Sequence, residues 1–182
     1  MSASQGRFAP PANDPPITAD GQHSQAWAAH FQDVASHIET VGVGIVDGSD
    51  AAAGQVGEVI ASAVAGPGIG IGNNVPTNVT SLPLTAGDWD VRGEVWFHLG
   101  SGPTGSCEAG ICLASGTLPG NPGQGSRATQ TFTHTANSGQ VLALAPCRIS
   151  LPAAAAVYLV ALCGFSGGST TAYGRIDARR TR

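Results

Sequence analysis

Apolar and polar residues alternate most regularly over residues 89–99. Apolar residues or glycine occupy the odd positions: Trp89, Val91, Gly93, Val95, Phe97 and Leu99. Polar residues, with Trp96 as the exception, occupy the even positions: Asp90, Arg92, Glu94, Trp96 and His98. A period of two places successive side chains on opposite faces of a β-strand. The pattern predicts an antiparallel strand with one face in the core and one in water.

Shorter apolar stretches separated by Gly, Pro and Asn predict further strands. They cover residues 56–64, 79–84, 111–115, 128–133, 141–144, 148–151 and 172–178. Residues 157–165 are apolar at almost every position, which predicts a strand covered on both faces, within a sheet or by a neighbouring subunit. Residues 69–78 and 118–126 are expected to be long loops. Together these segments predict a mainly β fold, an antiparallel, jelly-roll-like β-sandwich.

The first part of the chain has a different pattern. Residues 1–19 contain two Pro-Pro pairs and are expected to form an extended arm, because proline restricts its predecessor and cannot donate a helical hydrogen bond. Residues 20–41 are expected to form a short amphipathic helix that serves as an anchor or oligomerisation element. Residues 42–55 are expected to be a linker, and residues 56–182 the β-sandwich domain.

Apolar residues recur along the predicted helix at steps of four, three and four: Trp27, Phe31, Val34 and Ile38. This is the spacing of a coiled-coil seam. A helix of this length is marginal in water by itself, so its stripe should be buried against its own domain, a second copy or another protein. His23, His30 and His37 repeat every seven residues; we interpret them as a solvated flank, with a metal or pH-sensitive site as the alternative.

Composition narrows the class of protein. Eight basic residues, all arginine, and twelve acidic residues give a net charge of −4, and only 11% of residues are charged. A nucleic-acid-binding protein usually carries a basic surplus, so we expect no nucleic-acid partner. Apolar runs are too short to cross a bilayer, and the first residues resemble no secretory signal, so we expect no membrane partner and synthesis in a cytoplasm.

The four cysteines do not follow a metal-binding spacing. Cys107 and Cys112 are separated by four residues, whereas Cys147 and Cys163 lie fifteen residues apart within apolar segments. Zinc sites need short paired spacings on both sides. We interpret the cysteines as buried thiols plus a pair in a surface loop. A Cys107–Cys112 bridge stays open as an alternative if the protein leaves the reducing cytoplasm.

Candidate catalytic groups are few. Residues 66–72 contain Gly-x-Gly-x-Gly but no helix follows, so we expect no dinucleotide or other cofactor site. Asp90 and Glu94 lie on one face of a strand about 13 Å apart, which exceeds the spacing of a glycosidase pair. His98 and His134 could act as bases, but we expect them, with Asp88, to be structural or exposed. The sequence therefore predicts no catalytic residue and no metal site.

Several motifs resemble those of a β domain found in structural proteins of tailed bacteriophages. They are Gly57-Glu58-Val-Ile, Arg148-Ile-Ser-Leu, Val157-Tyr-Leu-Val, the segment 78–91 with Leu-Thr-Ala-Gly-Asp-Trp-Asp-Val, and the terminal segment 171–180 ending in Ala-Arg-Arg. The resemblance covers about residues 54–182. It implies a non-enzymatic homotrimer of jelly-roll-like domains with an N-terminal particle anchor, located in the virion and made in the host cytoplasm.

The resemblance favours a capsid decoration (cement) or head-fibre protein. We prefer this class because one β domain and a short arm suit a protein that covers a surface, and no repetitive fibre shaft is visible. A protein of this class is expected to bind the major capsid protein. The alternative is a tail or neck fibre protein, bound to neck or tail proteins, whose β domain binds the host or a surface glycan. Trp96 would then be a sugar-stacking platform rather than a subunit contact.

Overall fold

The computed structural model describes residues 16, 22, 24–41, 49–100, 104–120, 125–131 and 137–181, and of residues 37–41 and 104 only the backbone. The chain divides into two compact units, Met1–Ser49 and Asp50–Arg182. Almost all of the predicted arm, residues 42–48 of the predicted linker, His23, His134 and the side chains of His37 and Ile38 lie outside the described residues.

The described part of the N-terminal unit is mainly the helix α1 (Gln25–Val41). Its start is set by Ser24, whose hydroxyl accepts a hydrogen bond from the backbone N–H of Trp27 at 3.4 Å, as an N-cap residue does. The rings of Trp27, His30 and Phe31 form a cluster with centroids 5.6–5.9 Å apart. Phe31 remains 47% exposed, and Trp27 and Val34 are half-buried.

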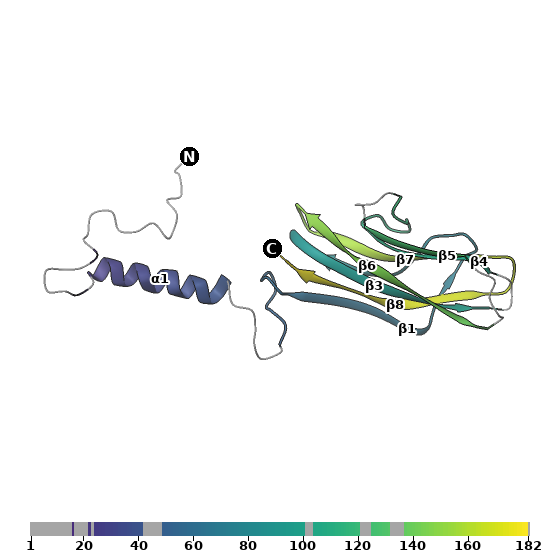
Figure 1. Cartoon of the computed structure of the whole chain (residues 1–182), viewed down its shortest axis with the longest axis horizontal. Coiled ribbons are helices and arrows are strands. Elements are labelled where there is room, and N and C mark those ends of the chain that lie inside the picture. The colour runs from purple at the N-terminus through teal and green to yellow at the C-terminus, as the bar shows by residue number, and fades with distance from the viewer. Residues whose placement is uncertain are drawn as a thin grey trace. The chain divides into compact units, whose positions relative to one another are not determined.

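The second unit consists of two four-stranded antiparallel sheets that face each other (Figure 1). The first sheet has the order β1 (Val59–Ile71), β8 (Thr170–Arg180), β3 (Gly87–Leu99) and β6 (Gly139–Leu151). The second has the order β2 (Thr77–Leu84), β7 (Ala155–Phe165), β4 (Thr104–Cys112) and β5 (Ser126–Thr131). This strand order is that of an eight-stranded jelly roll. The predicted antiparallel jelly-roll-like β-sandwich is confirmed.

The core lies between the two sheets and follows the alternation of the sequence. In β3 the apolar odd positions are buried, with Trp89, Val95 and Leu99 fully inaccessible, and the even positions Asp90 to His98 face solvent. This confirms the predicted two-faced strand. Side chains of both sheets meet there, since Ile111 of β4 and Leu159 of β7 belong to the same cluster.

The apolar strand β7 is central, between β2 and β4, as predicted. Its odd positions, such as Val157, face the core, and Val160 on its other face is also fully buried. Val160 pairs with Gly110 of β4, and Leu118 and Pro119 pack onto that glycine from outside the sheet. The chain thus covers Val160 itself, so the burial of this outward residue needs no neighbouring subunit.

Several expected segments have different bounds in the structure. The strand expected at 56–64 continues as β1 through the Gly/Pro-rich segment to Ile71, because a register shift between Val64 and Ile69 lets it stay paired with β8. The strands expected at 141–144 and 148–151 are one strand, β6, which passes Pro146 by an irregularity in its pairing with β3. Residues 113–116 form bends and turns rather than the end of a strand, and Leu118 and Pro119, in the expected long loop 118–126, pack on the sheet.

Candidate functional surfaces

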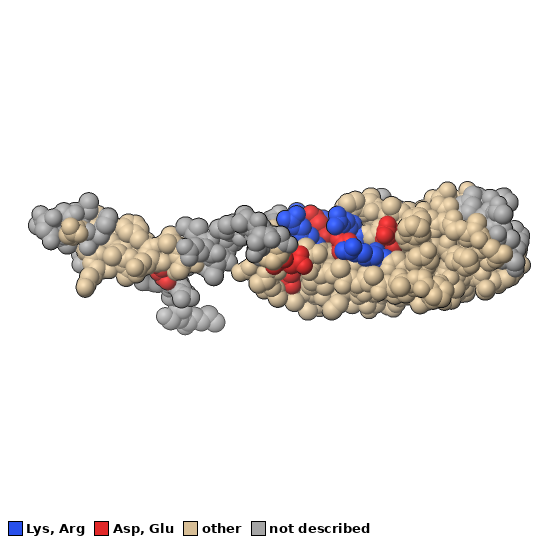
Figure 2. Space-filling view, turned by 90° about the horizontal axis from the view of Figure 1, so that it is seen from below, with Lys and Arg blue, Asp and Glu red and all other residues tan. Residues whose placement is uncertain are grey.

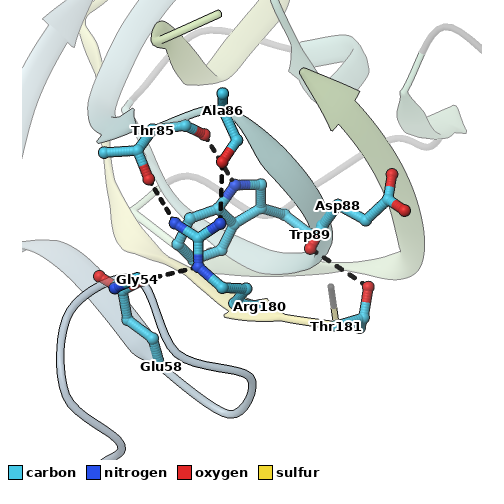
Figure 3. A network of polar contacts seen from close by, with 8 residues as sticks. All are labelled: Gly54, Glu58, Thr85, Ala86, Asp88, Trp89, Arg180 and Thr181. Atoms are coloured by element: carbon cyan, nitrogen blue, oxygen red, sulfur yellow. Dashed lines mark hydrogen bonds and ion pairs between the residues drawn. The ribbon is translucent and has the colours of Figure 1, made fainter. Parts of the chain in front are cut away.

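Three of the motifs that carry the bacteriophage resemblance meet in one buried network at an end of the sandwich (Figure 3). Arg180, from the end of β8, donates from Nε to Glu58 Oε2 at 2.9 Å and from a terminal nitrogen to the carbonyl oxygen of Ala86 at 2.8 Å. It also contacts the Thr85 hydroxyl. Its guanidinium lies 4.2 Å from the centre of the Trp89 ring.

The same network is reinforced by backbone hydrogen bonds. Gly57 N–H donates to the carbonyl of Arg180, Arg180 N–H donates to the carbonyl of Glu58, and Gly54 N–H donates to the Glu58 carboxylate at 2.8 Å. The Trp89 indole donates to the Thr85 carbonyl at 3.0 Å. These contacts join the segment before β1, the β2–β3 turn and the last strand.

Burial shows that this network is a structural clamp. The Arg180 and Glu58 side chains are only 6% and 10% exposed, and Trp89 is fully buried. Both charges are paired and hydrogen-bonded, as buried charges must be. Because the Glu58 carboxylate and the Arg180 guanidinium are paired with each other and buried, neither is available to a substrate.

The outer surface of the first sheet carries most of the charged residues in the described part of the β unit. Its members are Arg92, Arg148, Arg175, Arg179, Asp88, Asp90, Glu94 and Asp177. We call this set the charged face; its four arginines balance its four acids. Figure 2 shows acidic and basic side chains gathered over one part of the β unit, and mostly uncharged residues over the rest of the β unit's described surface in that view.

Ion pairs cross the strands of the charged face. Arg92 Nε lies 2.6 Å from Asp177 Oδ2, and Arg175 Nε lies 3.7 Å from the other oxygen of Asp177. Arg148 lies 2.6 Å from Asp88 Oδ2. The three arginine side chains are more than half exposed. Such exposed pairs contribute about 0–1 kcal/mol each, so the ion pairs of this face add little to stability.

An aromatic pair borders the charged face. Trp96 of β3 and Tyr173 of β8 are directly paired across the strands, with ring centroids 6.0 Å apart and planes inclined by 17°. Trp96 is 40% exposed. A Cβ atom at Gly66 of β1 would lie 3.7 Å from the Tyr173 ring, and Val141 of β6 pairs with Trp96. An apolar band therefore crosses the outer surface of this sheet.

A shallow hollow of about 310 Å³ lies next to this band. Arg92, Glu94, Arg175 and Asp177 line it together with the apolar Leu144 and Pro146. It occurs where the pairing of β3 with β6 shifts register between Val91 and Gly93. Its charged rim suits hydrogen bonds to a polar partner.

A second hollow, of about 640 Å³, lies between the turn after β4 and strand β6. Cys112 and Arg148 both line it, but neither is poised for catalysis. The Cys112 thiol lies 2.8 Å from the carbonyl oxygens of Ala114 and Thr117, and burial raises its pKa. Arg148 is paired with Asp88.

The cysteines are not arranged as the sequence suggested. Cys107 and Cys112 do not form a loop pair, because both lie within β4 and are buried. Cys107 instead pairs directly with Cys163 of β7, with a distance of 3.1 Å between the sulfur atoms. The hydrogen bond with Cys163 and burial raise the pKa of the Cys107 thiol. Burial, and then the charge of Asp90, raise the pKa of Cys147.

The other candidate residues lie apart from one another. Asp88 is engaged with Arg148, and Asp90, Glu94 and His98 lie along the outer face of β3. Among the described residues, no group of three His, Cys, Asp or Glu side chains could hold a metal ion. The described part of the chain also has no helix that is long and apolar enough to cross a membrane.

Sequence reasoning missed the clamp, although a signal was present. The inward positions of the last strand run Ala172, Gly174, Ile176 and Ala178, and the next inward position is Arg180. An arginine at a core position requires a buried acid as its partner. Glu58 is that acid, at the other end of the β unit's sequence.

No family model and no curated protein sequence matches this chain. Two structures from infectious bursal disease virus, one of a VP2 particle, are similar at 15% identity. They are the subviral particle (TM-score 0.49, 76% of this chain and 36% of that chain) and the T13 viral particle (TM-score 0.44, 76% and 35%). The chain spans about a third of their length. The baseplate tripod of bacteriophage Tuc2009 is similar at 18% identity (TM-score 0.34, 92% and 99%). These likenesses concern the β architecture alone.

Proposed function

We propose that this chain is a non-enzymatic structural protein of a bacteriophage virion, a homotrimeric capsid decoration (cement) or head-fibre protein. Its N-terminal segment attaches it to the particle through the major capsid protein, and the β unit faces outward. The motif resemblance supports the class of protein, since three of its motifs build the Arg180 clamp instead of a reactive site. The jelly roll, which recurs in viral capsid domains, is compatible with this role at the level of fold.

The observation that carries the anchor is the aromatic cluster of α1. Trp27 and Phe31 lie one helical turn apart, and Phe31 keeps 47% of its surface exposed. A helix of this length gains most of its stability from packing of its apolar face, so the apolar stripe to which Phe31 belongs supports contact with a partner. The stripe of Trp27, Phe31, Val34 and Ile38 would supply that contact, to the particle or to other copies.

Removal of residues 1–41 tests the anchor. The clamp and the core of the β unit use residues from Gly54 onward, so we expect the shortened chain to fold with its circular dichroism unchanged. It should no longer sediment with purified particles from which the native protein has been stripped. If it binds at the occupancy of the full chain, the anchor lies in the β unit.

The trimer is tested separately by sedimentation equilibrium of the full chain at micromolar concentration. We expect a species of three times the mass of the chain. Trp96 offers a matched pair of variants for the contact surface. If Trp96 is a subunit contact, Trp96→Ala should shift the equilibrium toward the monomer, whereas His98→Ala, two positions along the same face, should not. A monomer at every concentration would contradict the trimer.

The Trp96–Tyr173 pair is the specific observation that favours the alternative function, a tail or neck fibre that binds a host surface glycan. Sugar rings stack on exposed aromatic faces, and the charged rim of the adjacent hollow could bind hydroxyl groups. A glycan array distinguishes the two functions. Saturable binding of one glycan class that Trp96→Ala abolishes and His98→Ala retains would favour the fibre; no binding would leave the decoration protein as the better account.

A further inference from the structure

We propose that Cys107 and Cys163 form an intrachain disulfide that joins β4 to β7 once the protein has left the reducing cytoplasm. The two residues are direct partners in the antiparallel pairing of these strands. Their sulfur atoms lie 3.1 Å apart, and both residues are fully buried. No other pair of the four cysteines is aligned in this way.

The geometry allows the bond without movement of the strands. Directly opposed residues of an antiparallel pair have Cα atoms about 4.5 or 5.5 Å apart. Both values fall within the range of about 4.4–6.8 Å found for disulfides. The sulfur atoms need to approach by about 1 Å to reach the bonded distance of about 2.05 Å. Side-chain rotation at two neighbouring positions suffices for that.

The other two cysteines have different surroundings. The Cys112 thiol is directed to the carbonyl oxygens of Ala114 and Thr117. Cys147 belongs to β6, at the edge of the opposite sheet, and is half-buried. Four cysteines allow three complete pairings. The register of β4 and β7 selects Cys107 with Cys163 and leaves Cys112 and Cys147 as thiols.

The oxidant is a small-molecule disulfide such as glutathione disulfide. The thiolate of one cysteine attacks it, forms a mixed disulfide and releases one glutathione thiolate. The thiolate of the second cysteine then attacks the protein sulfur of the mixed disulfide and releases the second glutathione. The protein loses two electrons and two protons, and the oxidant becomes two thiols. Burial and the hydrogen bond between the two thiols keep thiolate scarce, so the reaction should be slow and should proceed through local opening.

The bond would close a loop between residues 56 positions apart, which spans β5 and β6. Such a cross-link restricts the unfolded chain. It would therefore stabilise the β unit after release from the cell. The inference rests on the proposed function in one respect, because only an exported or released protein, such as a virion component, meets an oxidising medium.

The test uses the full chain purified under reducing conditions and then incubated with glutathione disulfide. The remaining thiols are alkylated after denaturation, and peptides are mapped by mass spectrometry. We expect a loss of two hydrogens, a peptide pair linked through Cys107 and Cys163, and alkylated Cys112 and Cys147. The melting temperature should rise by about 10 °C. Cys112→Ser should keep the linked peptide, and Cys163→Ala should lose it.

Three results would overturn the proposal: a link from Cys107 to Cys112, a link between chains, or full alkylation of Cys107 and Cys163 after incubation close to the melting temperature.

A second experiment uses protein taken from purified particles. Protein from purified particles should carry the link, and protein from unlysed cells should not. A chain that forms the link in vitro but is absent from particles would contradict the virion function alone. A chain present in particles with all four thiols free would contradict the disulfide alone.

Discussion

Replacing Arg180 with methionine should unfold the β unit at a markedly lower temperature, because the substitution leaves the Glu58 carboxylate buried without its counter-charge. The side chains of this pair are 6% and 10% exposed. Breaking a buried pair by removal of one partner costs about 3–5 kcal/mol. The contact of the guanidinium with Trp89 is lost as well. We therefore expect a loss of about 4 kcal/mol in the free energy of unfolding.

The exposed pair on the charged face provides the matched control. Arg92 is joined to Asp177 by a contact of 2.6 Å, but its side chain is 69% exposed. Exposed pairs contribute about 0–1 kcal/mol. In thermal unfolding followed by circular dichroism, Arg180→Met should lower the melting temperature by about 12 °C and Arg92→Met by about 3 °C or less.

A double variant separates the buried charge from the lost packing. In Glu58→Met/Arg180→Met no unpaired charge remains, so the loss of stability should be smaller than the sum of the two single losses. The account of the clamp would be refuted if Arg180→Met were no more destabilising than Arg92→Met. It would also be refuted if the two single losses simply added, because the charges would then not be coupled.

Two further predictions concern the helix and the turn that covers the second sheet. Phe31→Ala should leave the melting temperature of the free chain nearly unchanged, since Phe31 is 47% exposed. It should weaken particle binding about a hundredfold or more if the ring is buried on the particle. Gln32→Ala should change neither the melting temperature nor particle binding. Equal binding by both variants would mean that the stripe is not the contact. Gly110→Ala should destabilise the β unit, because the added Cβ would lie 2.7 Å from Pro119 Cδ. Gly105→Ala should be tolerated, because its Cβ would lie 3.9 Å from the nearest atom. Equal melting temperatures of the two variants would contradict the packing of this turn.

The sequence predicted the class of fold because one strand, residues 89–99, alternates with Trp96 as the one exception and because residues 157–165 are apolar on both faces. Both features can be read from the local pattern of apolar and polar residues, because that pattern reflects which side chains are buried. Strand ends were predicted less well. Pro146 suggested a break between two strands, yet the pairing with β3 accommodates it by an irregularity, since β6 is an edge strand.

Contacts between distant residues could not be predicted in the same way. The pairing of Cys107 with Cys163 depends on the register of two strands that are not adjacent in sequence, and spacing along the chain does not reveal register. The pairing of Glu58 with Arg180 likewise joins the two ends of the β unit. Composition indicated few charges, but only the fold showed that they gather on one face of the first sheet.

The copy number of this chain in purified virions tests the central claim most directly. Quantitative mass spectrometry of particles, with the major capsid protein as the internal reference, gives that number. For a capsid decoration protein we predict copies comparable in number to those of the major capsid protein. A small fraction of that number, retained on isolated necks or tails, would favour the fibre. Absence of the chain from purified particles, with abundant chain in the lysate, would contradict the account.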